Sequence, residues 1–251
     1  MTILELKNVS VSFGGVKAIE DVSFSMEYGE VLSIVGPNGA GKTTLFNIIS
    51  RMYDLDSGSI IFDDIELQST PPHEIAKLGI ARTFQNTELF EHESVLSNLL
   101  IGSHVHTKTN LLHEFFFLGK ARNQELNFRK NAENIIDLLN LQSYRDKKIV
   151  SLPFGIRKLV EIGRALCLKP KLVLLDEPSS GLNPEETEDL VFQIEDIKEE
   201  LAISILMIEH DMNLVSKASD RVLALADGKV LTVGKSREVQ EHPEVIKAYL
   251  G

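Results

Sequence analysis

A glycine-rich segment directly follows the apolar run Val31 to Val35 and fills the pattern G-x-x-x-x-G-K-[ST]. Its residues are Gly36, Pro37, Asn38, Gly39, Ala40, Gly41, Lys42, Thr43 and Thr44. The glycines let the backbone curl so that successive N–H groups point inward and form a concavity that fits a phosphate group. The pattern predicts a bound nucleoside triphosphate, with Lys42 on the β- and γ-phosphates and the Thr43 hydroxyl on Mg²⁺.

A second apolar run, Leu172 to Leu175, ends in Asp176 and Glu177. In a buried parallel strand such an ending lies at the carboxyl edge of the sheet, beside the glycine-rich segment. Asp176 is therefore predicted to hold Mg²⁺, directly or through water, and Glu177 to orient or deprotonate the attacking water. An acidic pair after a strand is common by itself, so this prediction depends on the phosphate loop upstream.

Charge and composition limit the classes of function. The chain has 251 residues, 43% of them hydrophobic, and a formal net charge of −11, which disfavours broad contact with nucleic acid or anionic lipid. No apolar run approaches the roughly 18 residues needed to cross a bilayer, and the first residues lack the pattern of a secretory signal. We expect a cytosolic protein that reaches a membrane only through protein contacts.

The cysteine and histidine residues indicate neither a disulfide nor a metal site. The single cysteine, Cys167, excludes an internal disulfide and is interpreted as a small buried residue on a helix. His104 and His106 have a spacing found in metal sites, but no cysteine or carboxylate lies near them in the sequence, so no metal site is predicted there.

Hydrophobic periodicity predicts an α/β nucleotide-binding core formed by 1–90 and 165–234, with an inserted α-helical lobe at 91–164 and a helical tail at 235–251. Period-two alternation in the first thirty residues predicts antiparallel strands before the core. We further predict a helix capped by Thr70 with Pro71 in its first turn, a strand from Ile80 to Phe84, and a hairpin turn at Asp227 and Gly228. The fold class is thus a P-loop α/β core, with a mixed sheet flanked by helices.

The order of these motifs resembles that of the ATPase subunits of ABC transporters, and the resemblance covers essentially the full chain. It implies that Phe13 stacks on adenine. It also implies that Gln85 contacts Mg²⁺ and the attacking water and reports nucleotide occupancy to membrane subunits. His210, which follows another apolar strand, matches the family's switch histidine and is expected to hydrogen-bond the γ-phosphate.

The chain departs from the family at its signature, Leu-Ser-Gly-Gly-Gln, which reads Leu152, Pro153, Phe154, Gly155, Ile156 here. In the family this segment opens a helix that faces the ATP held by a second subunit, so two chains enclose two nucleotides. Pro153 supplies neither a serine hydroxyl nor a backbone N–H, but proline suits the first turn of a helix. The helix dipole and the Gly155 N–H remain available to phosphate.

A second departure is Asn183, where the family usually has aspartate. Asn183 is followed by Pro184, and Glu186 stands three positions after it. This spacing predicts a capping box at the start of a helix, with proline at the first helical position.

Within the family, the chain resembles the ATPases of branched-chain amino acid importers. The resemblance rests on the segment 81–85, the inserted stretch 104–129, the phrase 209–212 and the ending 245–251. It implies ATP and Mg²⁺ as cofactors and a second ATPase subunit, identical or a sister chain. It also implies two transmembrane permeases, an external substrate-binding protein, and a location at the cytosolic face of the membrane.

Three other classes of protein fit the sequence less well than an amino acid importer ATPase. The ATPase of a lipid or lipopolysaccharide exporter has a comparable size and ending, but that branch usually keeps the consensus signature. A soluble regulatory or structural ABC ATPase normally has coiled-coil heptads or two fused cassettes. A small-molecule kinase leaves the order of Gln85, Asp176, Glu177 and His210 without an explanation.

Overall fold

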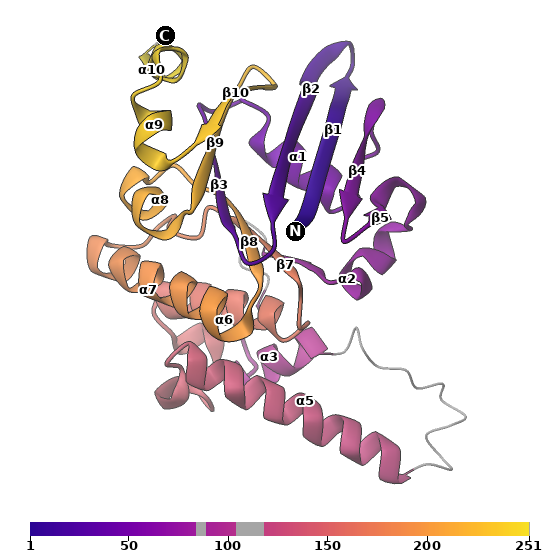
Figure 1. The fold of residues 1–251 in the computed structure, drawn as a ribbon. Helices are drawn as coiled ribbons and strands as arrows, with labels where there is room; N and C mark the ends of the chain where they lie inside the picture. Colours follow the sequence, from indigo (N-terminus) through magenta and orange to yellow (C-terminus); the bar gives the residue numbers. More distant parts are fainter. Residues whose placement is uncertain (84–88, 104–117, 251) are drawn as a thin grey trace. The chain divides into compact units, whose positions relative to one another are not determined.

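The computed structural model describes residues 1–83, 89–103 and 118–250 (Figure 1). The chain divides into two compact units. The first consists of 1–85 and 171–251, and the second of 86–170. Gln85 and the histidines at 104 and 106 lie outside the described residues.

The first unit contains an antiparallel sheet with the strand order β2-β1-β4-β5 (Figure 1). Its strands are β1 (Thr2–Phe13), β2 (Val16–Glu27), β4 (Ser57–Phe62) and β5 (Ile65–Glu66). Val9 pairs with Val22, and both side chains are fully buried. The antiparallel strands predicted from period-two alternation are confirmed.

A second sheet in this unit has the order β10-β9-β3-β8-β7-β6. Its strands are β3 (Val31–Val35), β6 (Ile80–Arg82), β7 (Leu172–Asp176), β8 (Ser204–Ile208), β9 (Arg221–Ala226) and β10 (Lys229–Gly234). All neighbours pair in parallel except β9 and β10. Every residue of β3, β7 and β8 is buried, which explains why these strands are mostly apolar on both faces. Because these strands are parallel, the segments that follow them meet at one edge of the sheet.

Helix α1 (Lys42–Ile49) joins both sheets into one hydrophobic core. Its side chains Leu45, Phe46, Ile48 and Ile49 are fully buried among residues from both sheets. The remaining helices of this unit are α2 (Ile75–Leu78), α7 (Pro184–Leu201), α8 (Met212–Ala218), α9 (Ser236–Gln240) and α10 (Pro243–Leu250). Two 3₁₀ turns, η1 (Leu67–Ser69) and η2 (Pro72–Glu74), precede α2.

One predicted helix start is wrong. Thr70 has extended backbone and ends η1, and the residue that precedes η2 is Pro71, which offers no side-chain cap. The pair Pro71 and Pro72 explains the shift, because a residue before proline is pushed toward extended backbone. Strand β6 ends at Arg82, while Phe84 of the predicted strand lies outside the described residues.

The second unit is built from α3 (Val95–Ser103), α5 (Leu118–Leu138) and α6 (Phe154–Leu166), with 3₁₀ turns η4 (Gln142–Tyr144) and η5 (Ile149–Ser151). Glycines allow the helices to cross closely: a Cβ on Gly102 would lie 2.2 Å from the Arg164 carbonyl oxygen. The predicted helical periodicity is confirmed for Ala132 and Ile135, which are buried, whereas Leu126 is exposed. Cys167 is buried as predicted, and this burial raises the pKa of its thiol to about 12.

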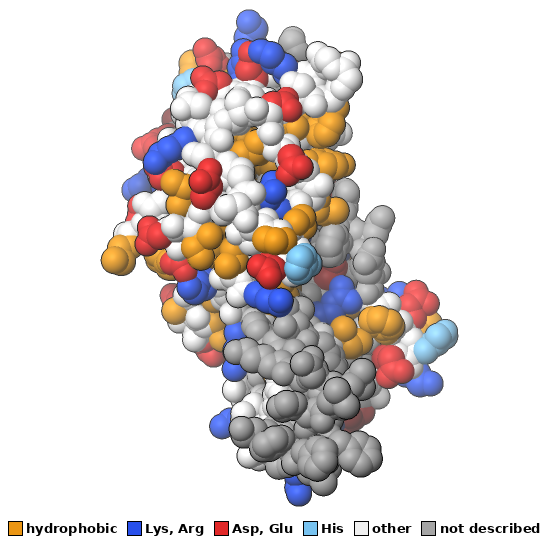
Figure 2. All heavy atoms as spheres, turned by 90° about the vertical axis from the view of Figure 1, so that its right-hand side faces the viewer, with side chains coloured by type: hydrophobic (Ala, Val, Ile, Leu, Met, Phe, Trp, Pro, Cys, Tyr) orange, Lys and Arg blue, Asp and Glu red, His pale blue; other side chains and the backbone are white. Residues whose placement is uncertain are grey.

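One face of the molecule carries side chains of every type. On the face drawn in Figure 2, acidic and basic side chains are interspersed, and apolar side chains form small groups between them. None of the described helices is long and apolar enough to span a membrane.

Helix α7 begins with the predicted capping box. The Asn183 Oδ1 atom accepts hydrogen bonds from the Glu185 and Glu186 N–H groups at 3.0 Å each, and the Asn183 N–H donates to Glu186 Oε2 at 2.9 Å. Removing such a cap costs about 1 kcal/mol of stability. We predict that Asn183→Ala lowers the free energy of unfolding in urea by about that amount. Asn183→Asp keeps the accepting oxygen and serves as the control; equal stability of both variants and the wild type would contradict a stabilising cap.

Candidate nucleotide-binding site

The glycine-rich segment between β3 and α1 is shaped by close approaches of neighbouring backbone. A Cβ on Gly36 would lie 2.0 Å from the Leu225 carbonyl oxygen, and one on Gly41 would lie 2.6 Å from the Ala18 carbonyl oxygen. Gly41 also has a φ of 102°, which is unfavourable for other residues. At Gly39, by contrast, a Cβ would meet nothing within 4 Å. The loop is therefore tightly held at both ends and open at its centre.

Helix α1 presents its N-terminus to this opening. Gly41 is its N-cap without a side-chain cap, and its first turn contains no acidic residue. The N–H groups of a helix start lack intrahelical acceptors, and the helix dipole is positive there. A phosphate group fits this arrangement because it supplies both the acceptors and the negative charge.

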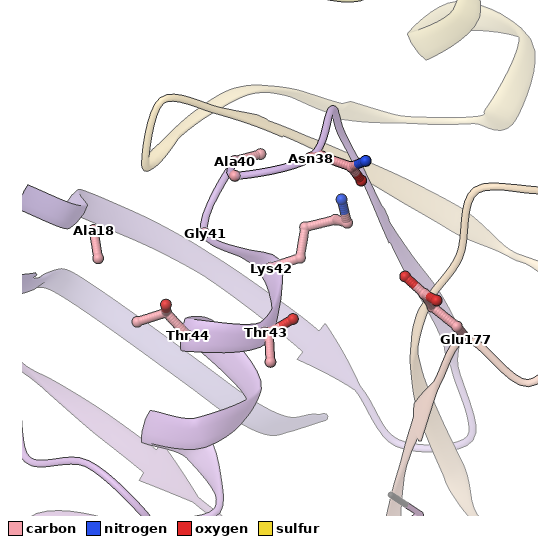
Figure 3. Close-up of a pocket in the computed structure, with 9 residues that line it drawn as sticks. Ala18, Asn38, Ala40, Gly41, Lys42, Thr43, Thr44 and Glu177 are labelled. Carbon is pink, nitrogen blue, oxygen red and sulfur yellow. The ribbon is translucent and has the colours of Figure 1, made fainter. Parts of the chain in front are cut away.

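Lys42 lies across the loop. Its ammonium group donates hydrogen bonds to the carbonyl oxygens of Gly36 at 2.7 Å and Pro37 at 3.0 Å. Burial lowers the pKa of Lys42, and the negative charges of Glu177 and Asp176 partly oppose that shift. Figure 3 shows the Lys42 and Glu177 side chains extending toward the same space.

That space is a pocket of about 320 Å³. It is lined by Ala18, Asn38, Gly39, Ala40, Gly41, Lys42, Thr43, Thr44 and Glu177 (Figure 3). The structure thus brings Glu177 together with most of the predicted phosphate loop. Ala18, from β2, was missed because no local sequence signal marks a small residue that contacts a distant loop.

Asp176 and Glu177 have different surroundings. Asp176 is buried at the end of β7, and its Oδ2 atom pairs with Arg82 at 3.1 Å. Glu177 has a φ of 49°, and its N–H donates to the Ile208 carbonyl oxygen at 3.0 Å. Left-handed backbone at a residue other than glycine costs about 1–3 kcal/mol and is often found at functional sites. In Glu177 it accompanies a turn that brings the carboxylate into the pocket.

His210 follows β8, and its side chain is 61% exposed. The preceding Glu209 is fully buried, and sequence reasoning gave it no role. Its carboxylate accepts hydrogen bonds from the N–H groups of Ser179 and His210 at 2.8 Å each and of Asp211 at 3.1 Å. One buried side chain therefore joins the segment after Glu177 to the segment that carries His210. A glutamate after an apolar run is a weak signal, because it gives no indication of which amides it meets.

Two further groups of predicted site residues have surroundings of their own. Phe13 is 44% exposed, and its ring meets the Tyr53 ring edge-on at a centroid distance of 5.1 Å. In the second unit, α6 begins at Phe154 after the N-cap Pro153. Leu152 and Gly155 are buried there, whereas Phe154 is exposed. The predicted helix start at the altered signature is confirmed.

The residues present fit Mg²⁺ bound with nucleotide. Thr43 and Asp176 offer the hard oxygen donors that Mg²⁺ prefers, and this ion usually takes one or two protein ligands beside phosphate and water. Among the described residues there is no cluster of three or more His, Cys, Asp or Glu side chains that would hold a metal alone. This donor set is the one expected for a metal that arrives with a phosphate ligand.

Comparison with known proteins decides the family. The family model described as ABC transporter matches residues 19–180. The chain belongs to the ABC transporter family. A second model, described as branched-chain amino acid ATP-binding cassette transporter, matches residues 229–251. The chain is also 38% identical to the high-affinity branched-chain amino acid transport ATP-binding protein BraF of Pseudomonas aeruginosa, over 99% of this chain and 98% of BraF.

Solved structures of the family share this fold. The ADP conformation of MJ1267, an ATP-binding cassette of an ABC transporter, has a TM-score of 0.87 and 34% identity, covering 100% of this chain and 99% of that one. The dimeric ATP-binding cassette MJ0796 bound to ADP and Pi has a TM-score of 0.76 and 26% identity, covering 94% and 99%. The predicted P-loop ABC ATPase fold is confirmed, and the chain is a nucleotide-binding ATPase of this family.

A glycine outside the predicted loop supports its shape. Gly228 lies in the predicted β9–β10 turn, with φ values of 48° at Asp227 and 74° at Gly228. The Gly228 N–H donates to the Ala40 carbonyl oxygen at 3.0 Å, and its carbonyl oxygen accepts from the Glu20 N–H at 2.9 Å. A Cβ on Gly228 would lie 2.8 Å from the Ala18 carbonyl oxygen. The turn thus fixes the loop and β2 at the same time.

We predict that Gly228→Ala weakens ATP binding by about tenfold, which corresponds to about 1.4 kcal/mol, because the added methyl displaces Ala18 and the loop. Titration calorimetry on the purified chain measures the change. Gly29→Ala is the matched control, since Gly29 has a φ of 69° but a Cβ there would meet nothing within 4 Å. Equal ATP affinity in the two variants would show that the turn does not shape the loop.

We also predict that Glu209→Ala lowers the free energy of unfolding by about 3 kcal/mol, because each buried N–H left without an acceptor costs about 1–3 kcal/mol. Urea denaturation measures this loss. Glu238→Ala, which removes a carboxylate that accepts from a single exposed amide, that of Lys235, is the comparison. A loss no larger than that of Glu238→Ala would contradict the bridging role.

Proposed function

We propose that this chain is the ATP-hydrolysing subunit of an importer for branched-chain or related amino acids. The observation that carries the hydrolytic role is the convergence of the phosphate loop and the Glu177 carboxylate on one pocket. The amino acid cargo is supported by the likeness to BraF and by the C-terminal match at 229–251. The same match favours an importer over the lipid exporter considered above.

The residues divide the chemistry between them. The loop amides and Lys42 bind the phosphates, and Phe13 stacks on adenine. Thr43, Asp176 and Gln85 hold Mg²⁺, which neutralises phosphate charge when bound. Glu177 orients the attacking water or accepts its proton, and His210 donates to the γ-phosphate. In phosphoryl transfer, positioning and electrostatic stabilisation supply most of the catalysis. The main catalytic contribution of this site is therefore the way its loop holds the phosphates.

The complete site requires a second ATPase subunit. Residues Leu152, Pro153, Phe154 and Gly155 contact the nucleotide of that partner, through the helix N-terminus of α6 and the Gly155 amide. The dimer of MJ0796 supports this arrangement for the fold. Two permease subunits hold the pair at the cytosolic face of the membrane, and an external binding protein delivers the cargo. Nucleic acid is not a partner in this proposal.

We predict that Glu177→Gln keeps ATP binding but lowers turnover by about 10²- to 10⁴-fold, the usual contribution of a general base. ATP binding is measured on the isolated chain, and phosphate release on the transporter assembled with its partners. Glu188→Gln is the control, because Glu188 is exposed on α7 and pairs with Lys217. Wild-type turnover in Glu177→Gln would refute the assignment.

Uptake measurements test the cargo separately. Vesicles that enclose ATP and the ATPase subunits, with the binding protein and labelled leucine, isoleucine or valine outside, should accumulate the amino acid, and those with Glu177→Gln should not. ATP hydrolysis without uptake of any of the three would refute the cargo and leave the ATPase role intact.

A further inference from the structure

A buried guanidinium group lies beside the proposed Mg²⁺ site. Arg82, the last residue of β6, has a side chain that is only 9% exposed, and its partner Asp176 is 5% exposed. One terminal nitrogen of Arg82 donates to Asp176 Oδ2 at 3.1 Å. Nothing in the reaction assigned above uses Arg82.

The other terminal nitrogen of Arg82 binds helix α1. It donates to Asn47 Oδ1 at 2.7 Å and to Ser50 Oγ at 3.1 Å. The guanidinium carbon also lies 5.6 Å from the centre of the Phe46 ring, which is on the same helix. These contacts fasten Arg82 to α1 through both hydrogen bonds and packing.

Arg82 therefore connects the two elements that carry the proposed Mg²⁺ ligands. Thr43 lies in the first turn of α1, and Asp176 ends β7. The planar guanidinium holds its nitrogens at a fixed separation, so it sets the spacing between its partners. A lysine ammonium is a point charge on a flexible chain and cannot fix that spacing in the same way.

The next residue strengthens the connection. The Thr83 hydroxyl accepts a hydrogen bond from the Asp176 N–H at 3.3 Å and donates to the Leu174 carbonyl oxygen at 3.4 Å, all within the buried core. Two successive residues after Ala81 thus hold Asp176, one at its carboxylate and one at its backbone. Such an arrangement fixes the direction of a carboxylate rather than merely neutralising it.

We propose that Arg82 is a positioning residue of the Mg²⁺ site: by bridging α1 and β7 it holds Thr43 and Asp176 at the spacing that binds Mg²⁺ together with ATP. The proposal rests on the assignment of Thr43 and Asp176 to Mg²⁺ made above. In this role Arg82 acts through Thr43 and Asp176. Its loss should lower the affinity for Mg²⁺ and leave the phosphate loop intact.

The test uses the purified full-length chain and binding of a fluorescent ATP analogue. Mg²⁺ is titrated at fixed analogue concentration, and binding is also measured in EDTA. We expect Arg82→Lys and Arg82→Met to raise the Mg²⁺ concentration for half-maximal effect by about tenfold or more, the usual consequence of removing a residue that orients a metal ligand. Affinity for the analogue in EDTA should stay within about twofold of wild type, because Lys42 and the loop amides are unchanged.

Arg221→Met is the matched control. Arg221 pairs with Glu30 at 3.1 Å, and the Glu30 side chain is 7% exposed, so this variant also breaks an ion pair with a buried acid in the same unit. It should lower thermal stability without changing the Mg²⁺ requirement. Arg82→Lys retains the charge and keeps the test possible where Arg82→Met folds poorly.

Asp176→Asn and Thr43→Val distinguish the assignment of the Mg²⁺ ligands from the positioning role of Arg82. If these variants keep the wild-type Mg²⁺ requirement, the metal assignment itself is refuted. If they lose it while both Arg82 variants keep it, Arg82 is only a structural ion pair and the inference is refuted. A loss of analogue affinity in EDTA equal to the loss with Mg²⁺ would show general damage to the loop, which also refutes a positioning role.

Discussion

The shape of the site depends on backbone carbonyl groups of two sheets that lie very close to one glycine-rich loop. They lie so close that a Cβ atom at the loop glycines would clash with them. The Leu225 carbonyl of β9 reaches Gly36, and the Ala18 carbonyl of β2 reaches Gly41. Gly228 adds a hydrogen bond to Ala40 between these points. The phosphate concavity is therefore fixed by long-range strand pairing and not by the loop alone. A change far along the chain can distort it without touching a phosphate.

Buried charged groups hold neighbouring segments in place at the same sheet edge. Glu209 satisfies three amides from two segments, and Arg82 joins Asp176 to α1. Burying a charge is costly, and an apolar replacement of similar volume is often equally stable. Their value here is geometric, because each connects segments that follow different parallel strands. Parallel strands bring those segments to one edge, but only specific contacts fix their relative positions.

Much of this was predictable from local sequence. The glycine-rich loop before a helix, the turn at Asp227 and the capping box at Asn183 each depend on residues a few positions apart, and the structure confirms these three local conformations. The predicted helix cap at Thr70 was wrong because two prolines shifted the helix start. The roles of Ala18 and Glu209 were not predictable, because their partners are set by strand order. When the strand order is unknown, the sequence does not predict which distant N–H group a carboxylate will accept from.

Lys42 ties the start of the loop to the first turn of α1. Its ammonium group donates hydrogen bonds to the carbonyl oxygens of Gly36 and Pro37. Burial disfavours this charge, and Glu177 and Asp176 oppose that effect. Glu177 therefore supplies a carboxylate to the pocket, and the charges of Glu177 and Asp176 together favour the protonated form of Lys42. Phosphate binding then reinforces a charge pattern already present, and preorganisation of this kind is the main source of electrostatic catalysis.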